Sequence, residues 1–307
     1  MIKVKLFTLY VFVKGFFCPC ASDKKINDYE VSRGKHQLRI SRAGKLPAEL
    51  SECSGMIVHD SVSFWGLNDS GGKAELYKVS MEGALLETIV VPGAVNVDWE
   101  ALTKDPYGNL YIGDFGNNRN RRTNLRIYKY NIKNQYLDTI HFSYSDQAGF
   151  PPPAGKMNYD AEAFFWYNDS LYIFSKNRGH KNVKIYRLPD QPGVYQAEIV
   201  DSMYISSMVT DAAIRPDQQT FSLLTYGKIF EFSMPEGNVS FSKPVRCVRF
   251  PRSGQAETIV YLSPSQQLIS NENRKLFVLE KKKRQPFRNH FLKIKNTAST
   301  RKPNPIR

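Results

Sequence analysis

The chain has 307 residues and a mass of 35.2 kDa, and 41% of its residues are apolar and 13% aromatic. This composition can bury a large core, which excludes a disordered chain, a collagen-like repeat and a small disulfide-held scaffold. A formal net charge of +14 would ordinarily point to a nucleic-acid partner. The charge lies at the two ends, however, in residues 1–22 and 274–307, and residues 23–273 are formally neutral. We therefore expect no nucleic-acid ligand.

Residues 1–22 combine lysines, an apolar run from Leu6 to Val13 and small residues near a possible cleavage point. This is typical of an export leader, and the apolar run is too short for a membrane-spanning helix. Two interpretations stay open: a signal peptide cleaved near Ser22, or a lipoprotein leader that leaves the mature chain anchored to a membrane through a lipidated Cys20. Both predict an exported body, located in the periplasm, at the cell surface or on the outer membrane as a lipoprotein.

The body contains two further cysteines, Cys53 and Cys247. An even number permits a disulfide in an oxidising compartment, but the sequence does not show whether the two meet. We expect both to be buried and unpaired.

A five-residue pattern recurs along the middle of the chain: a polar residue, any residue, an acidic or small polar residue, a small residue and an apolar one. It occurs at 52–56, 98–102, 160–164, 210–214 and 255–259, and the closing apolar positions are 46, 62, 50 and 45 residues apart. Each copy opens a short strand that ends in a turn, and a second strand follows at 63–69, 109–115, 171–176, 221–226 and 267–273. Repeats of this length indicate a repeat architecture.

A third strand follows in every unit, and a fourth is visible in four of them, at 85–91, 138–144, 195–201 and 244–250. The alternating segment 36–42, before the first copy, can supply the fourth strand of the last unit. Four-stranded units arranged radially, with the last completed by a strand from the other end of the chain, form a β-propeller. We predict an all-β propeller of five blades over residues 36–284. Six blades are the alternative, because the 62-residue spacing and the loop at 151–153 could hide a degenerate unit.

Within each copy of the pattern, the first and third side chains point the same way, because successive residues of a strand face opposite sides. The pairs are Glu52 and Ser54, Asp98 and Glu100, Asp160 and Glu162, Thr210 and Ala212, and Gln255 and Glu257. A second polar row lies twelve residues after each closing apolar position, at Asn68, Asp114, Lys176, Tyr226 and Asn271. In a propeller the first strand lines the channel and the second returns antiparallel to it, so both rows should meet at one mouth.

Clustered carboxylates and Asn side chains without a Cys/His set suit a hard divalent cation, Ca²⁺ above all. The candidate metal ligands are Glu52, Asn68, Asp98, Glu100, Asp114, Asp160 and Glu162. The candidate catalytic residues are Glu100, Glu162 and Lys176, and the candidate substrate-binding residues are Arg119, Arg178, Tyr226 and Asn271. The structural alternative is that these acids accept backbone N–H groups and that the turns at 68–72 and 113–118 are simple turn formers.

Other chemistries lack support in the sequence. The five histidines share no spacing, and none pairs recognisably with a Ser or Cys nucleophile, which argues against a Ser-His-Asp hydrolase. The sequence has no phosphate-binding loop of the P-loop or dinucleotide type and no CxxC pair.

The basic segment 285–307 contains two aromatic residues, Phe287 and Phe291. Two rings are too few for a base-stacking platform. We expect a solvated, disordered tail, and contact with an anionic surface or polymer is the alternative.

Several motifs, taken in order, carry a family resemblance. SGM (54–56), NDSGG (68–72), DWEAL (98–102), YIGDFGNN (111–118), DAEAF (160–164), SK (175–176), VTDAAI (209–214) and AETI (256–259) resemble a group of exported bacterial β-propeller proteins. These are mostly uncharacterised and are distantly similar to the gluconolactonase/senescence-marker group and to propellers labelled esterase-like or phytase-like. The resemblance covers about residues 45–280.

The resemblance implies a divalent-metal site at one mouth of the channel. Glu100 and Glu162 would be central, with Glu52, Asp98, Asp160, Asn68 and Asp114 as further candidates. The fourth unit departs from the pattern, because Thr210 and Ala212 replace the acidic pair, and so does Gln255 in the fifth. The implied site is therefore one-sided.

We expect a monomer that binds a small molecule or a surface polymer. Two functions are consistent with these observations. The first is a hydrolase of an ester, lactone or phosphoester, in which a metal polarises the substrate oxygen and a carboxylate acts as base toward water. The second is a non-catalytic surface binding or scaffold propeller that uses the same mouth for a glycan, peptide or protein.

Overall fold

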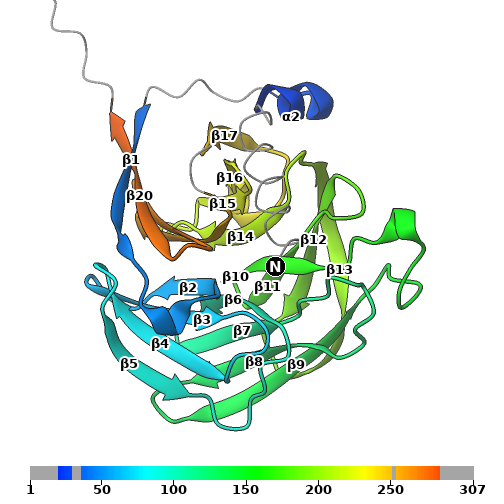
Figure 1. Ribbon diagram of the computed structural model, residues 1–307. Coiled ribbons are helices and arrows are strands. Elements are labelled where there is room, and N and C mark those ends of the chain that lie inside the picture. Colours follow the sequence, from blue (N-terminus) through cyan, green and yellow to red (C-terminus); the bar gives the residue numbers. More distant parts are fainter. Residues whose placement is uncertain (1–19, 30–35, 251–253, 284–307) are drawn as a thin grey trace, which may run out of the picture.

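The computed structural model describes residues 20–29, 36–250 and 254–283 (Figure 1). In this part of the chain, five units of four antiparallel strands form the blades of a β-propeller. The expected leader, apart from residues 20–22, and the expected tail at 285–307 lie outside the described residues. No helix of the described part is long and apolar enough to cross a membrane.

The blades follow one another along the chain. Blade 1 contains β2 (Cys53–Val58), β3 (Ser63–Asn68), β4 (Glu75–Ser80) and β5 (Leu85–Val90), and blade 2 contains β6 (Trp99–Lys104), β7 (Asn109–Asp114), β8 (Leu125–Asn131) and β9 (Tyr136–Tyr144). Blade 3 contains β10 (Ala161–Tyr167), β11 (Ser170–Ser175), β12 (Asn182–Pro189) and β13 (Gly193–Tyr204). Blade 4 contains β14 (Val209–Ile214), β15 (Thr220–Thr225), β16 (Lys228–Ser233) and β17 (Pro244–Arg249). Blade 5 contains β18 (Ala256–Ser263), β19 (Gln266–Asn271), β20 (Lys275–Lys283) and β1 (His36–Lys45).

The ring of blades closes in two ways, through contacts between innermost strands and through a strand pairing in blade 5. Each innermost strand contacts the next, and β18 of blade 5 contacts β2 of blade 1. The outermost strand of blade 5 comes from the other end of the chain, because β1 pairs antiparallel with β20. This pairing covers the β20 edge, whose N–H and C=O groups would otherwise be exposed. Five blades and closure by the N-terminal strand are confirmed.

The six-blade alternative is wrong. The long spacing between the second and third copies of the pattern is taken up by the loop at 115–124 and the connection at 145–160, which contains the short 3-10 helix η2 (Ala154–Lys156). Blades 2 and 3 are also joined at their outer edges, where β9 and β13 pair in parallel.

Aromatic side chains fill the spaces between blades. Phe115 of blade 2 packs against Phe164 of blade 3 with ring centroids 5.3 Å apart. Phe165 and Phe174 of blade 3 both pack at 5.6 Å against Phe221 of blade 4. A large aromatic ring buries much apolar area, while only two side-chain torsions have to be fixed. An aromatic-rich sequence therefore suits sheets that pack face to face.

The innermost strands share a β-bulge near their first residues. One residue per blade is skipped in the pairing with the second strand, and these residues are Ser54, Glu100, Glu162, Thr210 and Glu257. In blade 4 the bulge places Thr210, rather than Ala212, at the position of Glu100. The predicted alignment of that blade was therefore wrong by two residues.

A short N-terminal helix, α2 (Cys20–Asn27), packs on β13 and β17 (Figure 1). Cys20 forms a disulfide with Cys247 of β17. The Asp23 side chain is fully buried and forms an ion pair with Lys228, which is also fully buried. Asn27 donates a hydrogen bond to the Tyr204 carbonyl (2.8 Å) and accepts one from the Tyr204 N–H (3.2 Å).

The disulfide corrects the prediction for Cys247, and the prediction for Cys53 is confirmed. Cys247 is only partly buried and is not unpaired, because Cys20 supplies a partner from a segment interpreted as a leader. Cys20 in turn has no valence left for a lipid thioether in this structure, and a cut near Ser22 would remove one end of the disulfide. Cys53 is free and buried, as predicted.

Candidate functional site: an acidic pocket at one mouth of the channel

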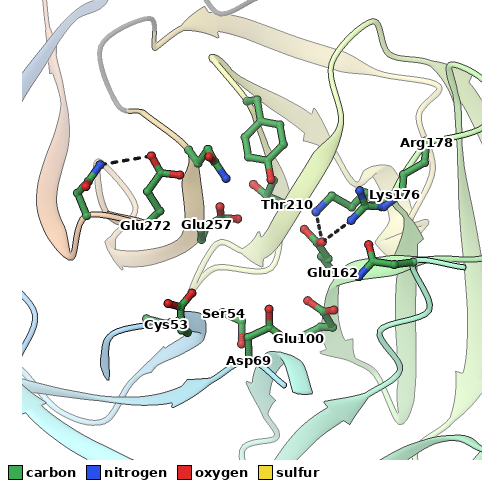
Figure 2. Close-up of a pocket in the computed structure, with 15 residues that line it drawn as sticks. Cys53, Ser54, Asp69, Glu100, Glu162, Lys176, Arg178, Thr210, Glu257 and Glu272 are labelled. Carbon is green, nitrogen blue, oxygen red and sulfur yellow. Dashed lines mark hydrogen bonds and ion pairs between the residues drawn. The ribbon is translucent and has the colours of Figure 1, made fainter. Parts of the chain in front are cut away.

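A cavity of about 700 Å³ opens where the innermost strands begin (Figure 2). All five bulge residues line it: Ser54, Glu100, Glu162, Thr210 and Glu257. A bulge turns its extra residue away from the pleated alternation. The repeated bulge thus aims one side chain from every blade at the same space.

A second ring of lining residues comes from the ends of the second strands. In four blades the residue directly after that strand lines the cavity, and these residues are Asp69, Lys176, Tyr226 and Glu272. The backbone N–H of each is bonded to the carbonyl two residues before the bulge, for example Asp69 to Glu52 at 2.9 Å. The ends of the first and second strands therefore converge on one mouth, as predicted, but from the predicted second row only Lys176 and Tyr226 line the cavity.

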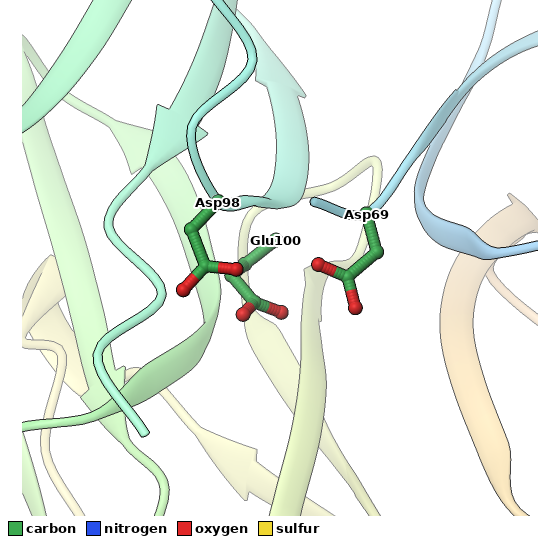
Figure 3. Close-up of side chains that lie close together, drawn as sticks. All are labelled: Asp69, Asp98 and Glu100. Atoms are coloured by element: carbon green, nitrogen blue, oxygen red, sulfur yellow. The ribbon is translucent and has the colours of Figure 1, made fainter. Parts of the chain in front are cut away.

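Three carboxylates from blades 1 and 2 lie close enough to share a cation (Figure 3). One oxygen from each of Asp69, Asp98 and Glu100 lies within 4.8 Å of the other two. We call these three residues the acidic triad. Asn96 holds the two blades in this arrangement, because its amide donates to the Asp69 carbonyl (2.9 Å) and its Oδ1 accepts the Trp99 N–H (3.1 Å).

The absence of a side chain at Gly116 allows this approach. A Cβ built at this position would lie 2.2 Å from Glu100 Oε1 and 2.4 Å from Asp98 Oδ2. Two carboxylates therefore rest directly against the backbone of residue 116, which is a space that any other residue would fill.

The negative charge of the triad is compensated only in part, by the charge of Arg122 at Asp98 and that of Lys176 at Glu100. Glu100 is 4% exposed, and its carboxylate has neither a hydrogen bond nor an ion pair with the described residues. Burial, followed by the charges of Asp69 and Asp160, raises the pKa of Glu100 well above its usual range. Burial and the Asp69 charge likewise raise the pKa of Asp98 to about 6. Like charges held in a low-dielectric site favour protonation or a bound cation.

The blade 3 side of the cavity is, by contrast, internally neutralised. Lys176 Nζ is in direct contact with the Glu162 carboxylate, and Arg178 bonds both Asp160 and Glu162. Lys176 is 3% exposed, and burial, reinforced by the Arg178 charge, lowers its pKa. Its ammonium also lies 5.6 Å from the Tyr226 ring centroid.

Blade 5 contributes two further carboxylates, Glu257 and Glu272 (Figure 2). Neither forms an ion pair with the described residues. Burial raises the pKa of Glu257, although the nearby Lys176 charge and a hydrogen bond with Gln255 lower it in part. Burial and the Glu257 charge raise the pKa of Glu272 to about 7.

Six of the predicted site residues line this cavity: Glu52, Glu100, Glu162, Lys176, Arg178 and Tyr226. Asp98 belongs to the acidic triad beside it.

Asn68 and Asn271 are turn formers rather than ligands. The Asn68 side chain accepts the Glu52 N–H (3.2 Å) and donates to the Glu49 carbonyl (2.6 Å). Asn271 accepts the N–H groups of Asn273 (3.1 Å) and Lys275 (2.9 Å). The following residues, Asp69 and Glu272, face the cavity instead. The fixed twelve-residue offset missed them because the connections between first and second strands vary. The turn has two residues in blade 3 and four in blade 1, and β18 of blade 5 has a second bulge at Leu262.

Asp114 and Asp160 are compensated by arginines and do not line the cavity. Asp114 is fully buried, pairs with Arg122 (3.0 Å) and Arg126 (2.8 Å), and accepts the Asp98 N–H (3.0 Å), so it positions a triad member. Asp160 is fully buried, bonds Arg178 and accepts the Asn117 N–H (2.8 Å).

Arg119 is exposed on the loop at 115–124 and is not among the lining residues, whereas its neighbour Asn118 is. Cys53 lines the cavity, but burial raises the pKa of its thiol to about 12. Because the thiolate is the reactive species, this cysteine is not a nucleophile.

The other ends of the same inner strands line a smaller cavity of about 340 Å³, with apolar residues such as Phe165, Ile214 and Leu262. That cavity is also lined by Lys104 and Arg215 but by no carboxylate, so among the lining residues the acidic groups gather at the first mouth.

Comparisons with known proteins identify the architecture. No family model matches the chain, and no curated protein matches it significantly. A PQQ-bound aldose sugar dehydrogenase from Streptomyces coelicolor is similar in structure, with a TM-score of 0.51 and 9% identity over 80% of this chain and 99% of that one. The likeness shows a β-propeller fold.

Two further structures are more distant. A structural genomics protein of unknown function from Bacteroides thetaiotaomicron has a TM-score of 0.46 and 9% identity, over 80% of this chain and 76% of that one. Virginiamycin B lyase from Staphylococcus aureus has a TM-score of 0.39 and 11% identity, over 80% and 99%. The closer resemblance to gluconolactonase-like propellers stays a prediction.

Proposed function

We propose that this propeller binds a divalent cation, Ca²⁺ by its ligand set, at Asp69, Asp98 and Glu100, and that the cation holds an oxygen group of a small ligand in the pocket. The observation that carries the proposal is the state of Glu100. It is a buried carboxylate that lines the cavity, forms no hydrogen bond or direct ion pair with the described residues, and is crowded by the charges of other carboxylates, which the charge of Lys176 offsets only in part. Holding like charges together out of bulk water is unfavourable, and a bound cation offsets that cost.

The geometry of the triad fits calcium. Ca²⁺ takes oxygen ligands at about 2.3–2.6 Å, so two ligand atoms on one ion can be about 5 Å apart. The three triad oxygens meet this condition at 4.8 Å or less. The set contains no nitrogen or sulfur ligand, which disfavours zinc and copper.

A second candidate function is hydrolysis of an ester or lactone, and Lys176 is the observation that favours it. A bound divalent cation would polarise a substrate oxygen. Lys176 lines the same pocket, and its lowered pKa and direct contact with Glu162 suit a pair that exchanges a proton. If the protein turns over no substrate, the same pocket would serve a propeller that only binds its ligand.

Calorimetric titration of metal-free protein with Ca²⁺ tests the first proposal. The unaltered protein should bind about one ion, and Glu100→Gln, which keeps the side-chain size, should lower the affinity at least about tenfold, the equivalent of 1.4 kcal/mol. Glu198→Gln is the matched control, because Glu198 is exposed on β13 and pairs with Arg187 at 3.4 Å, away from the pocket. Equal affinities for all three proteins would refute the site.

Assays on a panel of esters and lactones test the second function. Lys176→Met should abolish turnover and leave Ca²⁺ binding within about threefold. If the protein binds Ca²⁺ but turns over none of the substrates, the hydrolase function is rejected and the non-catalytic binding function stands.

A further inference from the structure

Three loops at the pocket mouth, on the side of blades 2 and 3, carry an excess of positive charge. They are 115–124, 145–160 and 176–181, and all three connect strands at the end of the blades where the innermost strands begin. The first and third contribute side chains to the cavity lining, and the second leads into β10. Together the loops contain seven Lys or Arg residues against two Asp.

Hydrogen bonds hold the three loops together. The Asn120 side chain accepts the Tyr159 N–H (2.7 Å), and the Asn120 carbonyl accepts from the Gln147 amide (3.3 Å), so the first loop is joined to the second. The Asn158 amide donates to the carbonyl of Asn182, the residue that follows the third loop (2.6 Å). The loops therefore form one continuous side of the mouth.

Four cations on this side have no counter-charge. Arg122, Lys176 and Arg178 are held in ion pairs with buried carboxylates. The side chains of the other four form no ion pair or hydrogen bond with the described residues, and three are exposed and one is half-buried: Arg119, Arg121, Lys156 and, half-buried, Lys181. We call these four residues the basic rim. Each lies within two residues of Asn120, Asn158 or Asn182, so the loop contacts bring their backbones to one surface.

The opposite side of the mouth has the opposite charge. The segments on the side of blades 1 and 5, at 46–52, 69–74, 91–98 and 272–274, contain five Asp or Glu residues against two Lys or Arg. This division is specific to the mouth, because residues 23–273 as a whole are formally neutral. An anionic ligand would therefore be attracted to one side of the mouth and repelled by the other.

The division selects among anionic partners by shape. Figure 2 shows the two sides across the cavity, with Lys176 and Arg178 opposite Glu272. A flat anionic surface such as a membrane, or a wide nucleic-acid duplex, would cover both sides and would meet the acidic segments as well. A narrow anionic chain can follow the basic rim alone.

The chemistry of the rim favours a carbohydrate among narrow chains. A single-stranded nucleic acid is held by several stacking aromatic rings, whereas Phe150, 44% exposed, is the one large apolar side chain exposed on these three loops. Peptides add to a strand edge or fill an apolar groove, and the loops present neither. Asn118 is exposed and lines the cavity. Its amide donates and accepts hydrogen bonds, as sugar hydroxyls do.

We propose that the basic rim binds the carboxylates of an acidic oligosaccharide, a short chain of uronic acid units, and that one end of this chain presents its oxygens to the cation at the acidic triad. Carboxylates suit both contacts, because they pair with Arg and are ligands that Ca²⁺ prefers. The inference names the ligand class of the proposed function and rests on it for the second contact. The rim contact needs no cation.

Calorimetric titrations of the metal-free protein in a chelating buffer test the rim contact. The probes are hexagalacturonate, the neutral maltohexaose, the acidic peptide hexaglutamate and the single strand hexathymidylate. Hexagalacturonate should bind at least about tenfold more tightly than each of the others, and its affinity should fall as the salt concentration rises. Absence of hexagalacturonate binding, or equal binding of any other probe, would overturn the proposal.

Two variants with the same change in net charge locate the contact. Replacing all four residues of the basic rim with Gln should lower hexagalacturonate affinity at least about tenfold. The control replaces four exposed cations away from the mouth with Gln, on β1 and on turns at the other end of the blades: Arg39, Arg42, Lys133 and Lys243. The control should stay within about threefold of the unaltered protein. Equal losses in the two variants would assign binding to overall charge and overturn the proposal.

A membrane partner gives a different result. Sedimentation with phosphatidylglycerol vesicles should show no loss of binding in the rim variant relative to the control variant. Vesicle binding that depends on the basic rim, without hexagalacturonate binding, would assign the rim to a membrane and overturn the proposal.

Failure of this inference and failure of the cation site can be told apart. If Ca²⁺ does not bind but hexagalacturonate binding still depends on the basic rim, the cation site is refuted and the rim contact stands. In Glu100→Gln, the affinity of the metal-free protein for hexagalacturonate should not fall. A fall of about tenfold or more in that variant, with no effect of the rim substitutions, would place the contact at the triad and overturn this inference.

Discussion

Gly116 sets the distance between two triad members, and it does so by lacking a side chain. The backbone of this residue is not in the left-handed region, so alanine is permitted there on conformational grounds. Gly116→Ala should displace the Glu100 and Asp98 carboxylates, because a Cβ would lie 2.2 Å from Glu100 Oε1. We expect at least about a tenfold loss of Ca²⁺ affinity, measured calorimetrically.

Gly155→Ala is the control for this substitution, since a Cβ at residue 155 has no heavy atom within 4 Å. Unchanged Ca²⁺ affinity in Gly116→Ala would show that the carboxylates do not need their observed positions.

Glu272 links the pocket to pH. The folded state raises its pKa from 4.5 to about 7, so the folded state binds more protons than the unfolded state in this range. The stability of the metal-free protein should therefore fall as pH rises from about 4.5 to 7. Because the side chain is partly exposed and water screens its charge, we expect a contribution of about 1 kcal/mol.

Urea unfolding of the metal-free protein at pH 5 and pH 7.5 measures this contribution. In the Glu272→Gln variant, the free energy of unfolding should differ between the two pH values by about 1 kcal/mol less than in the unaltered protein. An identical pH dependence in both proteins would contradict the account of this residue.

Some site residues could be predicted from the sequence and some could not. Glu100 and Glu162 stand out because carboxylates are unfavourable in an inner strand unless something requires them. Asp69 and Glu272 were missed although each directly follows a predicted residue, because a fixed offset cannot follow turns of unequal length or the second bulge of β18. The ion pairs that hold Asp114 outside the cavity lining could not be predicted, because its partners, Arg122 and Arg126, lie on the next loop and strand, and pairing between elements is not visible in spacing.

At the scale of the elements, the repeated bulge explains both the success and the failure of the pattern. Every innermost strand carries one, which is why a five-residue pattern recurs. In blade 4 the bulge residue is Thr210, and the small residues that follow it imitate the pattern two positions later. A pattern of small and apolar residues fits both registers, the one with Thr210 at the bulge and the one with Ala212 there.

The helix α2 acts as a clasp between the N-terminal segment and blades 3 and 4. The disulfide joins residues 227 positions apart, and closing so long a loop restricts the unfolded chain strongly. Cys20→Ser combined with Cys247→Ser should lower the free energy of unfolding by about 2–4 kcal/mol. Thermal unfolding with and without a reducing agent measures the effect.

Cys53→Ala is the control for the clasp, because its thiol is buried and free and a reducing agent should still lower the melting temperature of this variant. Peptide mapping without reduction should recover the Cys20–Cys247 pair from the purified protein. A lipid on Cys20 in that material would contradict the clasp.

The whole molecule combines a regular frame with an irregular charge distribution. Five blades present equivalent positions to one mouth, but blade 1 offers Ser54 and blade 4 offers Thr210 where the others offer glutamate. The fold could be predicted because alternating strands, turns and repeat length all agree. The clasp could not, since nothing in the local sequence of α2 indicates which blade it meets.

A formally neutral body between basic ends therefore contains a locally acidic pocket, and the central claim is that this pocket holds a divalent cation. A crystal structure of the protein grown with Ca²⁺ tests the claim most directly, through the anomalous signal of the ion. One peak is expected, within about 2.3–2.6 Å of oxygens from Asp69, Asp98 and Glu100. A pocket that holds water alone at saturating Ca²⁺, or an ion bound elsewhere, would contradict it.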